Sequence, residues 1–533
     1  MGLFRSTSQR ARLPRARCVV LAPATRATRA TLTPVTPGAA LAVLAVFGGC
    51  LGSCAPSQGG DGHGILVIAV DAMRADHLSY NGYDRRTTPA LDALSADGVH
   101  FRQAFSAAPR ILPAHIALLT GCDPGIAERP PLPDGSRFSV AFNWAIPPSA
   151  PHLARQFLIA GYDTAAFMDH PWMETHYGFA EGFEDYHDQR VDEQEGPMTV
   201  GVEGVAARFL QWVRNRPARA NWFAYLHLND LERSWKQPDA ERDTLFEPRA
   251  ELSSVPPLSL GEKVFFAVPR SRWSGGLHSL GEYEARYDGA LFQLDRKLGR
   301  LFARLKKSGY WEHTTVIVTG SYGFGFGESG FIMDNGSLSD VDLHVPLIVR
   351  PAEDLDCDRG ARRHNLVSLI DLAPTALELA GLPLPPGMHG ISQREALVES
   401  ADPPDAQGGP RRLAHASHGY HAGWAVMDGR YCLERSWPGS KGPGLLSGSW
   451  FGDDRNHRED VRELLHDRRL SETAGHLGSG KDNPELLASL RAEAEAWREL
   501  VTRARDVMQE TPWEKAALPE EELEELRARG LIP

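Results

Sequence analysis

The sequence contains little cysteine and no apolar run long enough to span a membrane, and each shortage excludes a class of protein. Six cysteines in 533 residues exclude a small disulfide-stapled scaffold. Cys122, Cys357 and Cys432 follow residue 54 and lack metal-ligand spacing, although one disulfide could form among them in an oxidising compartment. The apolar run 39–47 is far shorter than the roughly 20 residues that cross a bilayer.

Residues 1–54 lack acidic side chains altogether. They hold seven arginines, then the apolar run 39–47, then small residues before Cys50 and Cys54. This order is typical of a signal peptide, and both cysteines resemble the lipobox of bacterial lipoproteins. We therefore expect a leader over 1–54 with Cys50 or Cys54 lipidated, a tether over 55–63, and a location on the periplasmic face of the bacterial cell envelope. An ordinary signal peptide on a secreted protein is the alternative.

The remainder of the chain lacks any excess of positive charge. The whole chain carries a formal net charge of −12, and removing the seven leader arginines leaves −19. A body this acidic argues against a nucleic-acid partner, because binding to phosphate backbones depends on basic side chains. A hydrophobic content of 42% and a charged content of 24% are ordinary for a globular protein.

Short apolar runs alternate with helical patterns. The runs, which are typical of strands buried on both faces, lie at 65–70, 163–168, 222–228, 315–320 and 346–350. The helical patterns lie at 88–98, 150–161, 287–309 and 366–381. This alternation predicts an α/β domain over 64–395 with a doubly wound, mostly parallel central sheet flanked by helices. An Asp-Gly hairpin within 421–437 and an amphipathic segment at 483–508 predict a smaller α+β region over 396–533 with a helical tail.

Polar residues follow four of the predicted strands. They are Asp71, the pair Asp169 and His170, the pair Asn229 and Asp230, and the pair Ser321 and Tyr322. Ligands of such sheets bind beyond the carboxyl ends of the strands. We therefore expect these four strand ends to converge on one cleft.

The stretch 70–121 resembles the N-terminal signature of the sulfatase family, within the alkaline-phosphatase-like superfamily. Further stretches that resemble the family are 161–186, 287–320, 325–331, 343–350 and 368–393. The resemblance implies the alkaline-phosphatase-like fold. It also implies a reaction in which a hydroxyl or hydrated aldehyde attacks sulfur or phosphorus, activated by a divalent metal and placed at a helix N-terminus.

The family's nucleophile motif is altered in this chain. The motif reads Cys or Ser, any residue, Pro, any residue, Arg, and a large branch reads Thr-Leu-Pro-Ser-His instead; residues 111–115 here read Ile-Leu-Pro-Ala-His. Pro113 suits the first turn of a helix, and Gly121 suits its end. Ile111 has no lone pair with which to attack, and the formylglycine route requires Cys or Ser at that place. His115 is retained, either as a structural residue or as one that holds an anion.

The resemblance also implies altered metal-ligand and substrate positions. Asp71 keeps the position of a metal ligand, with Ala72 where many relatives have a second aspartate. The alternative for Asp71 is a structural role, in which it caps the neighbouring helix or bonds loop N–H groups. Ser321 and Tyr322 replace an Asp and a His ligand of the branch. Asp230 and Glu232 correspond to the Asp and His of the family's Asp-Pro-His. Asn335 replaces a His or Lys that contacts the substrate ester, while Asp288 and Glu328 persist in organising loops.

These replacements together favour an envelope protein of sulfatase type that no longer hydrolyses esters and has no cofactor. Any divalent metal (Ca, Mg, Zn or Mn) would lie near Asp71. Such a protein would bind a sulfated or phosphorylated glycan or small ester, or pair with an active relative, and would reach the membrane through a lipid anchor. One alternative is an active metal-dependent hydrolase with a displaced nucleophile at Ser106, Ser321 or Tyr322. Another is a structural lipoprotein whose cleft is filled by Ile111, Tyr322 and Phe324.

Overall fold

The structure is a computed structural model in which residues 60–533 form one compact unit. It describes residues 62–127, 145–170, 173, 175–188, 201–217, 220–233, 239–250, 277, 279–326, 332–334, 338–399, 414–417, 423–436, 462–467 and 483–509. The predicted leader with Cys50 and Cys54, nearly all of the tether, and the positions Glu328 and Asn335 lie outside these residues.

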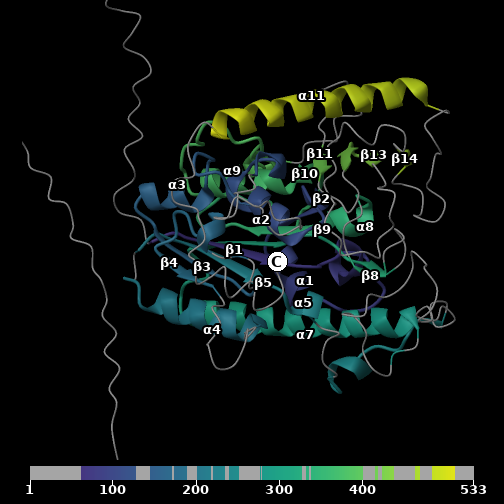
Figure 1. The fold of residues 1–533 in the computed structure, drawn as a ribbon. Coiled ribbons are helices and arrows are strands. Elements are labelled where there is room, and N and C mark those ends of the chain that lie inside the picture. The colour runs from purple at the N-terminus through teal and green to yellow at the C-terminus, as the bar shows by residue number, and fades with distance from the viewer. Residues whose placement is uncertain are drawn as a thin grey trace, which may run out of the picture. The chain divides into compact units, whose positions relative to one another are not determined.

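The core of the unit is an eight-stranded sheet with the order β10-β2-β9-β6-β1-β5-β3-β4 (Figure 1). The strands are β1 (Gly64–Val70), β2 (Val99–Phe105), β3 (Asp163–Phe167), β4 (Asp185–His187), β5 (Trp222–Leu228), β6 (Thr314–Gly320), β9 (His344–Arg350) and β10 (Arg362–Ser368). Only β9 runs antiparallel to its neighbours, β2 and β6. The predicted mostly parallel sheet is confirmed.

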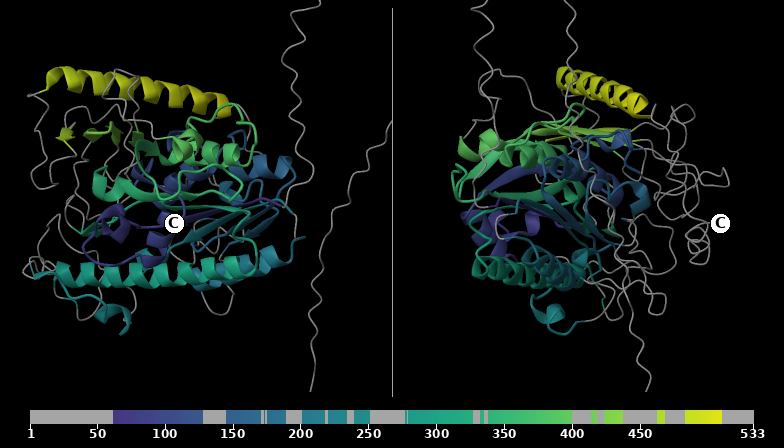
Figure 2. Two further views of the ribbon diagram at one scale, coloured as in Figure 1. Left: turned by 180° about the vertical axis from the view of Figure 1, so that it is seen from behind. Right: turned by 90° about the vertical axis from the view of Figure 1, so that its left-hand side faces the viewer.

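Helices cover both faces of this sheet, which explains why β1 and β5 are apolar and buried along their whole length. On one face lie α1 (Pro89–Ala96), α4 (Gly201–Arg214) and α7 (Leu280–Lys307); on the other lie α2 (Ile111–Thr120), α3 (Leu153–Ile159) and α9 (Leu372–Leu379) (Figures 1 and 2). The long helix α7 begins at a capping box, in which the backbone N–H groups and side chains of Ser279 and Glu282 bond reciprocally.

Shorter elements connect these layers. They are the helices α5 (Asp230–Arg233), α8 (Asp340–Leu343) and α10 (Arg394–Val398), the 3-10 turns η1 (Ala75–His77), η2 (Ser79–Asn81), η3 (Pro124–Ile126), η4 (Thr175–Tyr177), η5 (Arg242–Thr244) and η7 (Leu369–Asp371), and the strand pair β7 (Gly325–Phe326) and β8 (Ile332–Asp334). Among the helices in the described ranges, none is both long enough and apolar enough to cross a bilayer.

One predicted helix is partly wrong. The helical pattern 366–381 begins within β10, because residues 366–368 pair with residues 103–105 of β2, and only Leu372–Leu379 forms α9. The strands β2, β4 and β10 were not predicted. β2 and β10 carry arginine and histidine among their apolar residues, which hides the strand pattern.

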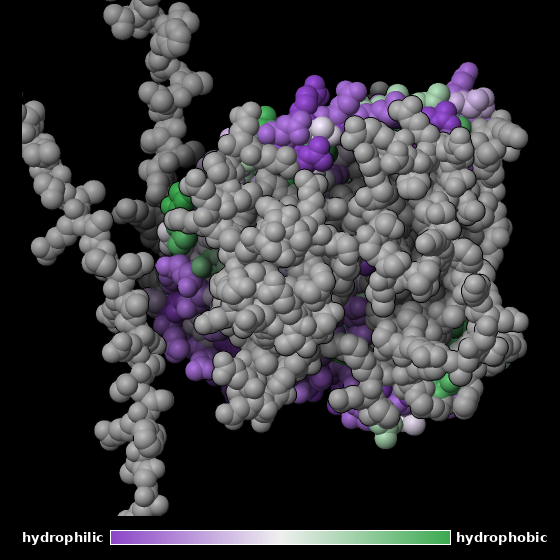
Figure 3. Space-filling view, in the orientation of Figure 1, coloured by the Kyte–Doolittle hydropathy of each residue, from purple (hydrophilic) through white to green (hydrophobic). Residues whose placement is uncertain are grey.

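A second, antiparallel sheet with the order β11-β12-β13-β14 follows. Its strands are β11 (Ala414–Ser417), β12 (Gly423–Met427), β13 (Tyr431–Ser436) and β14 (Arg462–Asp467), and α11 (Pro484–Gln509) packs against β12 and β13. The predicted hairpin and amphipathic helix are both confirmed. The outer side of α11 is mostly hydrophilic (Figure 3). The predicted boundary at 395 stays a prediction, as does the tail beyond Gln509, which lies outside the described residues.

The three cysteines beyond the predicted leader, Cys122, Cys357 and Cys432, are free thiols. Burial raises the pKa of the Cys122 thiol to about 12. The Cys122 thiol donates to the carbonyl of Gly387. It is therefore a packing residue beside the end of α2.

Candidate functional site

The carboxyl ends of β1, β5 and β6 meet in the middle of the sheet. Asp71 directly follows β1 and Ser321 directly follows β6, while His227 lies in β5 level with Ala69 of β1. His115 reaches the same point from α2. All four of the polar side chains have 0% exposure, so they form a buried polar cluster, which we call the Asp71 cluster.

Asp71 accepts hydrogen bonds from all three partners. Its Oδ1 lies 3.2 Å from Nε2 of His115, and its Oδ2 lies 2.7 Å from Nε2 of His227. The hydroxyl of Ser321 also donates to Oδ1. Burial alone would raise the pKa of Asp71, but His227 and His115 outweigh it and hold this pKa far below its usual range. Asp71 is therefore a carboxylate at every physiological pH.

The protons on the two imidazoles can be assigned from their outer partners. The backbone N–H of Asp169 donates to Nδ1 of His227 at 3.2 Å, so Nδ1 must offer a lone pair. A ring proton of His227 therefore sits on Nε2 and points to Asp71. Because Asp71 only accepts, His115 likewise carries its proton on Nε2.

The Tyr225 hydroxyl completes the arrangement around His115. It lies 2.6 Å from Nδ1 of His115. Burial raises the pKa of Tyr225 well above its usual value, so the phenol keeps its proton and donates it to Nδ1. Burial also lowers the pKa of His115 to about 4, against the opposing effect of Asp71. His115 is therefore neutral at pH 7.

A family model with the description "Sulfatase" matches residues 64–382, which is more than half of the chain. The chain belongs to the sulfatase family. It is similar to an arylsulfatase of Clostridium perfringens, with 22% identity over 390 residues that cover 63% of this chain and 78% of that protein. It is also similar to an N-acetylglucosamine-6-O-sulfatase of Bacteroides thetaiotaomicron, with 28% identity over 123 residues that cover 23% of this chain and 22% of that protein.

Solved structures share the sulfatase fold of this chain. The phosphonate monoester hydrolase SpPMH of Silicibacter pomeroyi superposes with a TM-score of 0.58 at 20% identity, covering 83% of this chain and 96% of that chain. At this level of identity the similarity shows the fold, and the chemistry has to be judged from the residues themselves.

A sulfatase normally uses a divalent metal, so the Asp71 cluster was tested for its fit to one. Asp71, His115 and His227 each offer a ligand atom, and these atoms lie within 4.8 Å of one another. A histidine that binds metal through one nitrogen donates a hydrogen bond from the other. The second nitrogen of His227 accepts one instead, from the Asp169 N–H. The hydrogen-bond directions in this sulfatase-family chain therefore do not fit a metal on His227, although the positions of the atoms do.

The helix framework around Ile111 is as predicted. Ile111 is the first residue of α2 and is 7% exposed, and Pro113 lies in the first turn. Gly121 ends the helix with a φ of 64°, a left-handed conformation that favours glycine. The assignment of Ile111 to the nucleophile's place stays a prediction from the resemblance.

The other predicted site residues have partners of their own. The Tyr322 hydroxyl donates to Oε2 of Glu232 at 2.9 Å. Oδ2 of Asp230 accepts from the backbone N–H of Val202 at the start of α4. Among the described residues, the side chains close enough together to share a metal ion are Asp71, His115 and His227. Asp230 and Glu232 do not belong to this group. Their role as metal ligands stays a prediction, and Asn335 lies outside the described residues.

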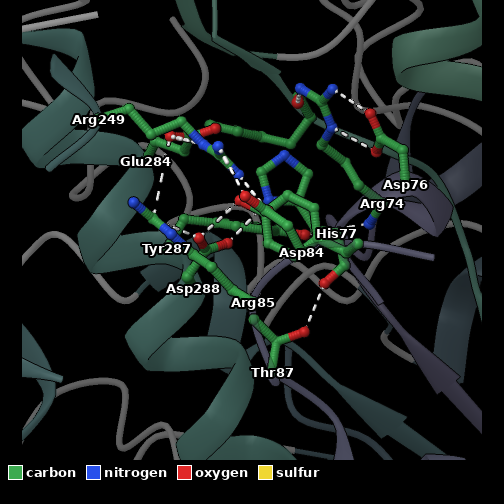
Figure 4. Close-up of polar contacts among 12 residues, drawn as sticks. Arg74, Asp76, His77, Asp84, Arg85, Thr87, Arg249, Glu284, Tyr287 and Asp288 are labelled. Atoms are coloured by element: carbon green, nitrogen blue, oxygen red, sulfur yellow. Dashed lines mark hydrogen bonds and ion pairs between the residues drawn. The ribbon is translucent and has the colours of Figure 1, made fainter. Parts of the chain in front are cut away.

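Asp288 organises the loops that follow β1, as expected. Its carboxylate accepts from the Tyr83 hydroxyl and from Arg85, both at 2.7 Å, and contacts Nδ1 of His77 at 2.8 Å (Figure 4). The neighbouring Tyr287 hydroxyl donates to the carbonyl of Ala72 at 2.7 Å.

The hydrogen bond from the Tyr287 hydroxyl supports an unusual backbone conformation at Ala72. Ala72 has a φ of 58°, and it is the one residue other than glycine with positive φ in the described ranges. The conformation costs energy for an L-residue. The strained residue lies directly after Asp71.

His227 is the member of the cluster that the sequence did not reveal. It is the one strongly polar residue in the run 222–228, Trp-Phe-Ala-Tyr-Leu-His-Leu. A lone imidazole in an otherwise apolar, fully buried strand needs a partner. That signal could have identified it.

Proposed function

We propose that this sulfatase-family chain does not hydrolyse esters and instead uses its fold to bind a sulfated or phosphorylated ligand. The observation that supports this proposal is the hydrogen bond from the Asp169 N–H to His227, which directs the opposite ring proton at Asp71. With Ser321 and His115 also donating, the Asp71 carboxylate accepts three hydrogen bonds. The bacterial envelope location stays a prediction from residues 1–54.

The displaced-nucleophile alternative has little support from the side chains it would need. The Ser321 hydroxyl donates to Asp71, but a carboxylate with so low a pKa is a very weak base. The Ser106 hydroxyl is bound to the carbonyls of Ala108 and Ser321. The Tyr322 hydroxyl is bound to Glu232. None of these three hydroxyls has a strong base beside it among the described residues.

The class of ligand follows from the relatives. The name of the Bacteroides relative states an N-acetylglucosamine 6-O-sulfate as what it acts on. A sulfated amino sugar is therefore the first ligand to test for this chain, with its phosphate analogue as the comparison. An active relative remains the alternative partner.

We expect the full chain to show no metal-dependent hydrolysis. The test is turnover of 4-nitrophenyl sulfate, an aryl phosphonate monoester and bis(4-nitrophenyl) phosphate, with added Ca²⁺, Mg²⁺, Mn²⁺ or Zn²⁺, because metal and nucleophile act as a unit in this chemistry. The Asp71→Asn variant, purified in parallel, measures contaminating activity. Turnover above that background that depends on metal and disappears in the variant would contradict the proposal.

A further inference from the structure

A cluster of cationic side chains lies at the edge of the central sheet, apart from the Asp71 cluster. β10 is the edge strand and β2 is its neighbour, whereas β9 and β6 separate β2 from β1. His100 of β2 lies opposite Arg362 of β10 in register, so both side chains project from the same face of the sheet. His364, two residues along β10, is close enough to act electrostatically on His100 as well.

The Tyr80 ring covers His100 on this face. It comes from η2, and the two ring centroids are 5.0 Å apart in an edge-to-face arrangement. The guanidinium of Arg102 donates to the carbonyl of Asn81 in the same turn at 3.3 Å. The turn η2 therefore forms one wall of the cluster, and β10 forms the other.

His100 is buried without a hydrogen-bond partner. It is 2% exposed, and among the described residues neither of its ring nitrogens is hydrogen-bonded. The Tyr80 hydroxyl beside it has no partner in that part of the chain either. Buried polar atoms in folded proteins are nearly always hydrogen-bonded, so these atoms call for a polar group that the described part of the chain does not supply.

Among the described residues, the side chains that act electrostatically on His100 are basic. Burial lowers its pKa to about 4, and Arg362, Arg102 and His364 lower it further. Arg362 and His364 are exposed and Arg102 is half-buried, so a ligand can reach them.

The nearby carboxylate of Asp92 already accepts hydrogen bonds. Asp92 acts on Tyr80, and its carboxylate accepts hydrogen bonds from the hydroxyls of Ser79 and Thr88. In a chain with a net charge of −12, this cluster of cations is a local exception.

We propose that this edge of the sheet binds an oxyanion, the sulfate or phosphate group of a larger ligand, between Arg102 and Arg362, with His100 as an additional donor. Planar guanidinium groups match the oxygens of such anions, and a neutral imidazole can donate one N–H to a third oxygen. This inference deepens the ligand-binding part of the proposed function and gives it a position. It does not depend on whether the Asp71 cluster is catalytic.

The test is calorimetric titration of the full chain with N-acetylglucosamine 6-sulfate and N-acetylglucosamine 6-phosphate, with N-acetylglucosamine as the uncharged probe. We expect both anions to bind and the uncharged sugar not to bind. Arg362→Gln should weaken anion binding about tenfold or more, because a charge-assisted hydrogen bond is lost. His100→Phe, which keeps the ring packing against Tyr80, should weaken it by a similar factor. The ratio of the two affinities distinguishes a sulfated from a phosphorylated natural ligand.

Arg394→Gln is the matched control, because Arg394 is also exposed but lies on α10, away from this face. Equal affinity of the wild type and Arg362→Gln, or no anion binding by the wild type, would overturn the inference. Arg362 is exposed, so its variant should fold and the result should be interpretable. Hydrolysis measured on the same preparations separates the two proposals, because turnover would contradict the proposed function and leave the binding result unchanged.

Discussion

Replacing Asp71 with alanine is expected to lower the free energy of unfolding by about 3–5 kcal/mol, the range measured when one partner of a buried charged group is removed. The reason is the set of donors left behind. His115, His227 and Ser321 all donate to this carboxylate, and all are fully buried. Each donor without an acceptor costs about 1–3 kcal/mol. Asp71→Asn keeps the shape and one acceptor oxygen, so its loss should be about half as large.

The measurement is urea unfolding of the wild type and both variants in the presence of a chelator. In an empty metal site, removing one carboxylate ligand relieves repulsion or leaves stability unchanged. In a hydrogen-bonded cluster, the same substitution lowers the free energy of unfolding. If Asp71→Ala were as stable as the chelated wild type, the Asp71 cluster would have to be a metal centre after all.

Acid should destabilise the protein steeply between about pH 6.5 and pH 4. The pKa of His115 is lowered to about 4 and that of His152 to about 3, both by burial. In this window the unfolded chain binds a proton at each imidazole and the folded chain does not, so stability falls as pH falls. For fully buried His115 the loss is about 3 kcal/mol, at about 1.4 kcal/mol for each unit of pKa shift. The depressed pKa of Asp71 adds a further loss of stability only below this window, because its stabilisation is lost below the unfolded pKa of an aspartate.

Unfolding free energies at a series of pH values test this expectation. His152→Phe is the matched variant, because both ring nitrogens of His152 are buried and unpartnered within the described residues and Phe183 packs against the ring. The variant should fold. Its free energy of unfolding should depend on pH less steeply, by about 1.4 kcal/mol per pH unit, because one titrating imidazole is removed. A stability that does not change between pH 6.5 and pH 4.5 would rule out neutral buried imidazoles at these two positions.

Much of the scaffold could be predicted from the sequence, because central parallel strands are uninterrupted apolar runs. β1, β5 and β6 are such runs, and the polar residues after them identified Asp71 and Ser321 correctly as neighbours. β2 was missed because it carries His100, Arg102 and Gln103 in its interior. Those residues are tolerated near the sheet edge, where the pattern of burial is weaker. His100 and Arg102 are also two of the residues from which the oxyanion site is inferred.

The direction of the hydrogen bonds could not be predicted from the sequence. The proton on His227 is determined by a backbone N–H, that of Asp169, which has no signature in the residue types. The pair formed by Tyr322 and Glu232 was hidden for a related reason. Each was considered separately as an altered ligand position, and only the fold brings the two side chains together. Residue types therefore identified a changed site, but only the contacts show how its polar groups are satisfied.

The tautomer of His227 tests the central claim most directly. Nitrogen-15 NMR of the full chain with labelled histidine, assigned by comparison with His227→Gln, distinguishes a protonated from an unprotonated ring nitrogen. We predict a proton on Nε2 and an unprotonated Nδ1, with no change when Ca²⁺, Mg²⁺, Mn²⁺ or Zn²⁺ is added. A proton on Nδ1, with an Nε2 signal that shifts on addition of metal, would contradict the account and identify Asp71, His115 and His227 as a working metal centre.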